Sequence, residues 1–218
     1  MSFVIAIDGP AGSGKGTITK LVAEKLNLTY IDTGATYRAI TYLVIKNNID
    51  IDDSKKIVDL SLNNNIYFDS NNHVFVNEED VTDKIRTKEV SKLVSKISSI
   101  VELRENMVNL QRKMAIGKNV IMEGRDITTV VFPEADFKFY LDASVEERAN
   151  RRYKQNKENN IDMSYDEILE NIKNRDYNDM HKEVGALKRC DDQIYIDTTN
   201  MSIDEVVDTI IKYIKGDD

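Results

Sequence analysis

The residues with the clearest capacity for chemistry lie near the N-terminus, between an apolar run (residues 3–7) and a stripe of apolar residues at helical spacing. This junction is rich in glycine and contains one lysine and one threonine. Such a turn can hold phosphate oxygens, because backbone N–H groups approach closely, the helix dipole favours an anion and the lysine adds a charge. We therefore predict a nucleotide-phosphate site formed by Gly9, Pro10, Ala11, Gly12, Ser13, Gly14, Lys15, Gly16 and Thr17.

The loop departs from the strict pattern G-x-x-x-x-G-K-[ST] in one position. Gly16 occupies the Ser/Thr slot, and the hydroxyl follows one residue later at Thr17. A dinucleotide-binding turn fits worse, since Thr17 stands where a third glycine is required. A tight turn with an incidental lysine is the structural alternative, but four glycines, a lysine and a hydroxyl at one junction weigh against it. The form resembles the P-loop of nucleoside monophosphate kinases.

Composition restricts the partners. The 218 residues have a formal net charge of −8, which argues against nucleic acid or an anionic membrane as the main partner. Nine of the ten arginines lie between Arg86 and Arg189, and arginine is suited to bidentate phosphate contacts. Cys190 is the only cysteine, so an internal disulfide is impossible and a reducing cytoplasm is expected. With only His73 and His181, no His/Cys metal cluster is predicted.

The remaining pattern predicts an α/β fold, with short β-prone segments that alternate with helical stripes. A large insertion between the second and third strands contains a hairpin signal, in which polar residues 69–72 separate two β-prone runs. We expect a five-stranded parallel sheet flanked by helices. Its strands should lie near residues 3–7, 29–32, 120–122, 137–141 and 194–196.

Three Ser-x-x-Glu capping boxes mark the starts of helices, at Ser144, Ser164 and Ser202. Between the first two lies the polar segment from Lys154 to Met163. This segment could be a plain solvated loop. In a kinase it would instead be a mobile lid that excludes water.

Three further stretches reveal a closer resemblance: Asp32-Thr-Gly-Ala-Thr-Tyr-Arg38, Glu123-Gly-Arg-Asp126 and Asn174-Arg-Asp-Tyr-Asn-Asp179. Together with the P-loop they resemble bacterial cytidylate kinases, over essentially the whole chain. The resemblance implies a single kinase domain with a core (1–32 and 118–218), a monophosphate-binding insert (about 33–117) that carries a small antiparallel sheet, and a lid (about 152–163).

The resemblance also implies the reaction, which is phosphorylation of CMP, and of dCMP, by ATP with Mg²⁺. Cytosine presents an amino donor and two acceptors, so a carboxylate or hydroxyl and a guanidinium can read it. The family's base contacts fall on Ser95, Arg104 and Asp126. Each of these residues alone could equally belong to a surface ion pair. Its contacts to the acceptor phosphate and ribose fall on Thr33, Arg38, Arg125, Arg175 and Asp179.

For the chemistry we expect Thr17 to hold Mg²⁺ and Lys15 to contact the β/γ oxygens of ATP. An acceptor phosphate with a second pKa near 6 is mostly ionised at pH 7, so no general base is needed. Positive charge around the transferring group should supply catalysis. Besides Lys15 and Arg125, the resemblance indicates Arg148, Arg151 and Arg152 as charge-stabilising residues, and the choice among these three stays open.

Three positions depart from the family pattern: Glu123 replaces Asp, Thr128 replaces Gly and Lys182 replaces Arg. None removes a group that the mechanism requires. Three rival functions remain, namely a UMP or AMP kinase, a hydroxyl kinase of the shikimate type with Asp32 as base, and a non-catalytic nucleotide-binding module. We expect a monomer that binds ATP and CMP or dCMP.

Overall fold

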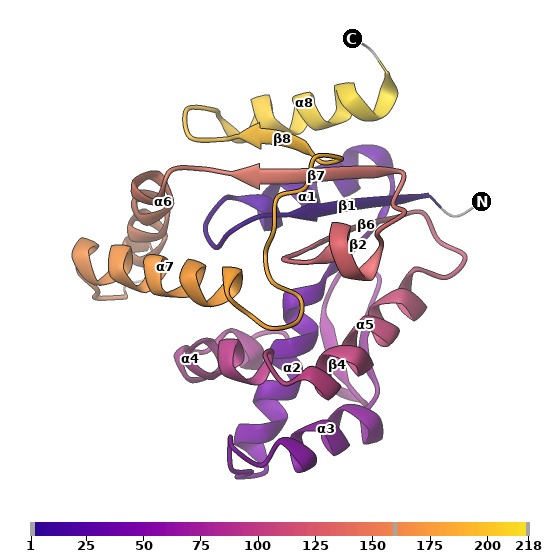
Figure 1. Cartoon of the computed structure of the whole chain (residues 1–218), viewed down its shortest axis with the longest axis vertical. Helices are drawn as coiled ribbons and strands as arrows, with labels where there is room; N and C mark the ends of the chain where they lie inside the picture. Colours follow the sequence, from indigo (N-terminus) through magenta and orange to yellow (C-terminus); the bar gives the residue numbers. More distant parts are fainter. Residues whose placement is uncertain (1–2, 159–160, 217–218) are drawn as a thin grey trace.

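The computed structural model describes residues 3–158 and 161–216, and a five-stranded sheet forms its centre (Figure 1). The strand order is β2-β6-β1-β7-β8, and each neighbouring pair is parallel. This confirms the predicted five-stranded parallel sheet. The strands are β1 (Val4–Asp8), β2 (Thr29–Asp32), β6 (Val120–Gly124), β7 (Phe137–Asp142) and β8 (Ile194–Asp197).

Alternation along β1 explains how the sheet is covered on both faces. Ile5 and Ile7 pack with α1 (Lys15–Leu26) and α8 (Ile203–Lys215), while Val4 and Ala6 face the cluster that includes α5 (Val101–Ala115). Ile5 and Ile7 are completely buried, and burial of such a side chain contributes about 1.5–3 kcal/mol. A strand buried on both faces therefore appears in the sequence as an unbroken apolar run.

The insert between β2 and β6 has an apolar cluster of its own, which includes Ile40, Ile57, Val76 and Leu103. A three-stranded antiparallel sheet lies within it, in the order β3-β4-β5, and confirms the predicted hairpin. The elements of the insert, besides α5, are α2 (Thr33–Lys46), α3 (Ser54–Asn63), β3 (Ile66–Phe68), β4 (Val74–Val76), β5 (Glu79–Asp80), a 3₁₀ turn (Lys84–Arg86) and α4 (Lys88–Ile97).

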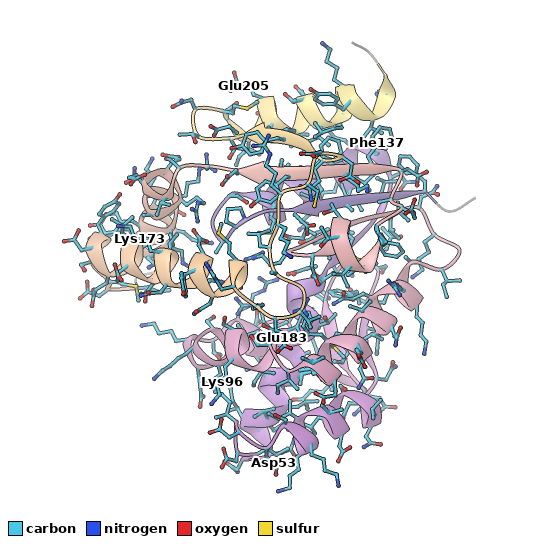
Figure 2. All side chains as sticks on the ribbon, viewed as in Figure 1. Asp53, Lys96, Phe137, Lys173, Glu183 and Glu205 are labelled. Atoms are coloured by element: carbon cyan, nitrogen blue, oxygen red, sulfur yellow. The ribbon has the colours of Figure 1, made fainter. Side chains whose placement is uncertain are left out.

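After β7 the chain forms the helix pair α6 (Val145–Glu158) and α7 (Tyr165–Met180), which pack on each other. The loop predicted to begin at Lys154 is wrong in its first part, because α6 continues to Glu158. Residues 159–160 of the expected lid lie outside the described residues. From α7 the chain descends toward the insert, where Figure 2 labels Glu183, and then returns to β8.

The helix starts follow the capping prediction in two of three cases. Ser164 and Ser202 form complete reciprocal boxes. At Ser144 only half of the box forms: its Oγ accepts from the Glu147 N–H at 3.2 Å, but its own N–H donates to Oγ1 of Thr199 at 2.9 Å. The reciprocal prediction is wrong here, because the Glu147 carboxylate binds Arg151 Nε at 3.0 Å instead.

In the described part of the chain, no helix combines the length and the apolar character that crossing a membrane requires.

Candidate functional site

The P-loop leaves β1 at the carboxyl edge of the sheet, where ligands bind in open α/β folds. It packs tightly against β7 and α6. A Cβ on Gly9 would lie 2.1 Å from the Leu141 carbonyl oxygen, and one on Gly12 would lie 3.1 Å from Cβ of Arg148. Gly12 and Gly14 also adopt left-handed backbone conformations, with φ of 82° and 86°. These positions therefore require glycine.

Lys15 is buried at the start of α1, and its Nζ donates to the Pro10 carbonyl at 3.0 Å. Burial, followed by repulsion from Arg125, lowers the pKa of Lys15 to about 7, although Glu123 opposes this shift. The positive charges of Lys15 and Arg125 thus repel each other. An anion bound near both side chains would relieve this repulsion and favour the charged form of Lys15.

The three arginines of α6 separate into two kinds. Arg148 is buried, and its Nη1 donates to the Ala11 carbonyl (3.1 Å) and pairs with Asp176 (2.6 Å). Arg151 donates to the Ser13 carbonyl (3.3 Å) and to the Thr198 carbonyl (2.6 Å). Both side chains therefore brace the backbone of the P-loop.

Arg152 differs from these two. It is exposed, and its Nη1 donates to Oε1 of Gln155 at 2.8 Å. Its charge acts on Arg38 and Arg175, whose pKa values burial lowers first and neighbouring cations lower further, to about 10 for Arg175. Arg152 therefore belongs to the same group of mutually repelling cations as Arg38 and Arg175.

The carboxylate of Asp179, on α7, interacts with three cationic side chains. Its carboxylate accepts from Arg125 Nε at 2.8 Å, pairs with Lys182 Nζ at 3.1 Å and lies 3.9 Å from Arg175 Nε. Burial disfavours the charge on Asp179, but these cations outweigh burial and hold its pKa below the usual range. Lys182, which replaces the expected arginine, thus keeps a contact to Asp179 with a single ammonium.

Arg104, on α5 of the insert, and Asp126, which follows β6, form a buried ion pair. Arg104 also donates to the Ser98 carbonyl at 3.0 Å, and its guanidinium lies 5.3 Å from the centre of the Tyr37 ring. Asp126 raises the pKa of Arg104 against the effect of burial. Within the described residues, Nε of Arg104 is buried without a hydrogen-bond partner. A buried donor of this kind can take a ligand or a water molecule as its partner.

The other predicted acceptor residues, Thr33, Arg38 and Ser95, lie on α2 and α4. Arg38 is half-buried, and its Nη1 donates to Oγ of Ser91 at 3.0 Å. Thr33 is buried and donates to the Glu123 carbonyl at 2.7 Å, which joins α2 to β6. Ser95 is half-buried on α4. Sequence reasoning assigned no role to Arg86, although it lies 3.7 Å from Asp32 and its charge acts on Arg38.

Two further residues of the site were missed in the sequence. Tyr37 lies under Arg104, and Asp8 ends β1 with its carboxylate completely buried. Burial raises the pKa of Asp8 to about 6 against hydrogen bonds from Thr128 and Ile127. A carboxylate that ends an otherwise apolar strand was the available signal for Asp8.

The structure fits a magnesium ion bound mainly by nucleotide phosphates. Among the described side chains, no group of three or more His, Cys, Asp or Glu could hold a metal. Thr17 is exposed in the first turn of α1. A Cβ on Gly16 would lie 2.9 Å from Oε1 of Glu123, so that carboxylate adjoins the loop. Hydroxyl and carboxylate oxygens are ligands that Mg²⁺ accepts, alongside phosphates and water.

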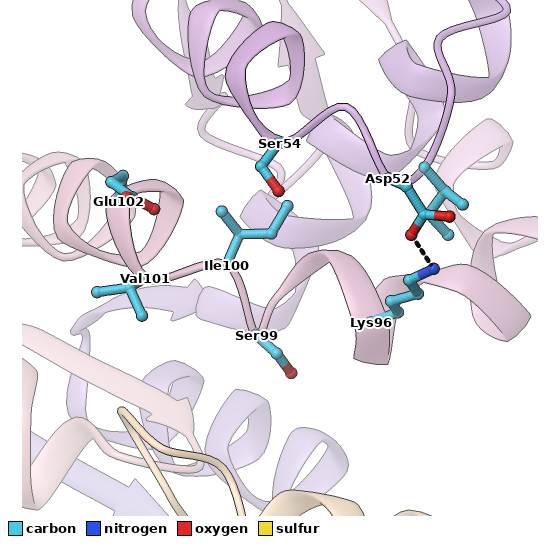
Figure 3. Close-up of a pocket in the computed structure, with 8 residues that line it drawn as sticks. Asp52, Ser54, Lys96, Ser99, Ile100, Val101 and Glu102 are labelled. Atoms are coloured by element: carbon cyan, nitrogen blue, oxygen red, sulfur yellow. Dashed lines mark hydrogen bonds and ion pairs between the residues drawn. The ribbon is translucent and has the colours of Figure 1, made fainter.

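A cavity of about 330 Å³ lies elsewhere, between α3 and the loop that joins α4 to α5 (Figure 3). Lys96 and Asp52 form an ion pair at its rim, and none of its lining residues belongs to the predicted site. The candidate site is instead a cluster of charged residues at the carboxyl edge of the sheet.

Comparison with known proteins addresses the identity of this site. The cytidylate kinase family model matches residues 5–216. The chain belongs to the cytidylate kinase family. It is 49% identical to a cytidylate kinase of Fusobacterium nucleatum over 214 residues, which cover 98% of each chain. It is 50% identical to a cytidylate kinase of Clostridium acetobutylicum, again over 98% of each chain. The predicted resemblance to this kinase family is confirmed.

Among solved structures, an uncharacterised protein from Eubacterium ventriosum aligns with a TM-score of 0.54 at 15% identity, over 98% of this chain and 99% of that one. A shikimate kinase from Acinetobacter baumannii aligns with a TM-score of 0.48 at 15% identity, over 100% and 95%. The first likeness concerns the fold alone, and the second carries no weight for activity.

Proposed function

We propose that this chain transfers the γ-phosphoryl group of ATP to CMP, and to dCMP, by direct in-line displacement with Mg²⁺ bound to ATP. The observation that carries this proposal is that the P-loop and Arg125 leave the same edge of the sheet, because Asp8 at the end of β1 is in register with Gly124 at the end of β6. The P-loop would be the donor loop, and Arg125 would form an acceptor cleft with Arg38, Arg104, Asp126, Arg175 and Asp179. Family membership supports the cytosine nucleotide as acceptor.

The donor phosphates would lie on the P-loop, residues 9–17. Backbone N–H groups and Lys15 would bind the oxygens, while Arg148 and Arg151 would keep the loop in shape from behind. In this proposal these two arginines are positioning residues. Arg152 is exposed and its charge acts on Arg38 and Arg175, so it is the better candidate for charge stabilisation during transfer, together with Lys15 and Arg125.

The acceptor phosphate would bind between Arg38 and Arg125. Burial lowers the pKa of Arg38, and the neighbouring arginines lower it further against the effect of Asp32, so a bound phosphate would relieve repulsion among these cations. Arg175 and Asp179 would contact the ribose. Since the phosphate is already mostly ionised at pH 7, the residues need only align it with the γ-phosphorus.

The cytosine base would bind to Arg104 and Asp126 and replace part of the contact between these two side chains. The Asp126 carboxylate can accept from the cytosine amino group, and Arg104 can donate to the ring acceptors, with the Ser95 hydroxyl beside them. The unpartnered Nε of Arg104 supports a polar ligand here. Uracil has a carbonyl where cytosine has its amino group, so it would oppose the Asp126 carboxylate.

Mg²⁺ would be held by the Thr17 hydroxyl, with Glu123 close to the loop as an additional negative group. When bound, the ion would neutralise charge on the ATP phosphates. The chain's own residues would orient both substrates and exclude water.

We also propose the division into a core (1–32 and 118–218), a monophosphate-binding insert (about 33–117) and a lid (about 152–163). The separate apolar cluster of the insert supports this division. We further propose that the chain acts as a monomer in the cytoplasm. The single, half-buried Cys190 is in keeping with a reducing compartment.

Product formation tests the reaction. Incubation with ATP, Mg²⁺ and CMP should yield CDP and ADP in equal amounts. A non-catalytic nucleotide-binding module would bind ATP tightly and form no CDP. That outcome would overturn the proposal and leave the ion pairs of the acceptor cleft without a function.

The shikimate-type rival is tested at Asp32. Its Oδ1 accepts from the Ala35 N–H at 3.1 Å and so caps α2. Asparagine keeps that acceptor, and Asp32→Asn should therefore reduce turnover by less than about 5-fold. A catalytic base would instead lose its proton acceptor, and loss of nearly all turnover would favour the rival.

A further inference from the structure

Asp8 connects the donor loop to the acceptor cleft. It ends β1, and the P-loop begins at the next residue. Its Oδ1 accepts from the Ile127 N–H at 2.9 Å, and its Oδ2 accepts from the N–H (2.9 Å) and the hydroxyl (2.6 Å) of Thr128. Burial of a carboxylate is costly unless hydrogen bonds compensate. The three donors therefore fasten β1 to the segment that follows Arg125 and Asp126.

These bonds replace a cap that the segment does not provide itself. Residues Ile127–Val131 form a π-helical turn, whose first N–H groups need acceptors. Asp126 precedes the turn and is the usual residue type for a cap. Within the described residues its side chain makes no capping bond and pairs with Arg104 instead. Asp8 thus caps the turn from another strand, while the Asp126 carboxylate pairs with Arg104.

Thr128 extends the connection to a third segment. Its Oγ1 donates to Asp8 and accepts from Nε2 of Gln193 at 2.5 Å, which uses both functions of one hydroxyl. Oε1 of Gln193 accepts from the Cys190 N–H at 2.8 Å. Gln193 therefore holds the end of the segment that links α7 to β8.

That linking segment also contacts the acceptor residues. Lys182 pairs with Asp179, and the Leu187 N–H donates to the Asp179 carbonyl at 2.8 Å. A Cβ on Gly185 would lie 2.0 Å from Nη2 of Arg104, so the backbone there packs directly on the guanidinium. A chain of hydrogen bonds thus runs from Asp8, beside the donor loop, through Thr128 and Gln193 to Cys190 in the linking segment, and earlier residues of that segment contact Asp179 and Arg104.

We propose that Asp8, Thr128 and Gln193 form a buried positioning unit that sets Arg125 and Asp126 relative to the P-loop. This inference rests on the proposed function, because it assumes that those two residues bind the acceptor. The unit touches no substrate itself. Its loss should therefore weaken use of CMP while the ATP site, whose loop is braced separately by Arg148 and Arg151, stays intact.

The sharpest test compares Thr128→Val with Thr128→Ser. Valine keeps the shape but removes the hydroxyl, which leaves Nε2 of Gln193 without this acceptor and Asp8 with only its two backbone donors. We expect the KM for CMP to rise about 10-fold and the KM for ATP to change less than about 2-fold. Serine keeps the hydroxyl and should restore the KM for CMP to within about 3-fold of the wild-type value.

Gln193→Met provides an independent variant, since it removes the donor from the far end of the unit. It should raise the KM for CMP in the same direction, and its effect should not add to that of Thr128→Val, because both break one bond. If Thr128→Val does not fold, the Gln193→Met variant alone decides the question through its effects on the two KM values.

Equal rises in both KM values, no rise at all, or failure of serine to restore the KM for CMP would overturn the inference. The wild-type enzyme is measured in the same assay. Absence of CDP from the wild type would overturn the proposed function and this inference with it. An active wild type with unselective variants would overturn the inference alone.

Discussion

The donor loop and the acceptor cleft are built in opposite ways. The donor loop is nine consecutive residues, shaped by glycines and braced from behind by Arg148 and Arg151. The acceptor cleft draws on α2, α4, α5, β6 and α7, and two of its arginines are held in ion pairs with carboxylates, Arg104 with Asp126 and Arg125 with Asp179.

This difference suggests a division of labour. In the proposed function, a preformed loop would bind phosphates that every nucleoside triphosphate carries. The acceptor residues would exchange their internal ion pairs for contacts with a nucleotide, and a wrong base would leave a buried charge without a partner. Selectivity should therefore reside in the cleft, and the two regions should respond differently to substitution.

Lys15→Ala should have the largest effect. It removes the one lysine of the donor loop, and turnover should fall by about 10³-fold or more while far-UV circular dichroism stays unchanged. Lys25→Ala is the matched control, because Lys25 lies in the last turn of the same helix and forms an exposed pair with Asp208. Steady-state CDP formation measures both. Near-normal activity of Lys15→Ala would contradict the role proposed for the donor loop in phosphoryl transfer.

Asp126→Ala should instead affect stability and the choice of acceptor. It leaves Arg104 buried without its carboxylate, so unfolding free energy should fall by about 3–5 kcal/mol. The ratio of kcat/KM for CMP to that for UMP should fall at least about 10-fold, with a smaller change in the KM for ATP. Steady-state kinetics and urea unfolding provide these values.

The control for Asp126→Ala is Asp52→Ala, which breaks the exposed Lys96–Asp52 pair of the insert (Figure 3). An exposed pair contributes at most about 1 kcal/mol, so stability and the acceptor preference should both be nearly unchanged. Equal losses in the two variants would mean that the buried pair has no special relation to the acceptor.

A smaller effect is the uptake of protons when ATP binds. The pKa of Lys15 is about 7 in the ligand-free protein, so at pH 8 the amine is mostly neutral. ATP phosphates favour its charged form, and binding at pH 8 should take up on the order of one proton. Calorimetry in buffers of different ionisation enthalpy measures this uptake. The Lys15→Ala variant should lose it, and equal uptake in both proteins would contradict the assignment.

The same pKa sets the sign of a stability effect. Because the folded pKa lies below the usual lysine value of 10.5, the unfolded chain binds more protons between about pH 7 and pH 10.5. The contribution of Lys15 to stability therefore rises with pH across this window. Lys15→Ala should flatten that part of the stability profile.

The sequence predicted those parts of the fold that depend on short, contiguous sequence patterns. The P-loop, the parallel strands and the hairpin follow from contiguous patterns of glycine, apolar and polar residues. The role of Asp8 was missed because its partners Ile127 and Thr128 lie about 120 residues away. The burial of Arg104 was also hidden, since it lies one residue off the apolar stripe of α5 and is covered by the distant Gly185.

Two further failures have physical reasons. The extension of α6 to Glu158 overrides a polar composition that resembles a loop, because polar residues can continue a helix on its exposed side. The capping box at Ser144 is incomplete because Glu147 has a stronger partner in Arg151. In both cases a neighbouring element decides between local options that the sequence alone leaves open.

The central claim is that the acceptor cleft selects a cytosine nucleotide, and the ranking of acceptors tests it most directly. With ATP and Mg²⁺ fixed, kcat/KM is measured for CMP, dCMP, UMP and AMP on the same wild-type preparation. The account predicts that CMP and dCMP exceed UMP and AMP by at least about 10-fold. A kcat/KM for AMP or UMP above that for CMP would contradict it.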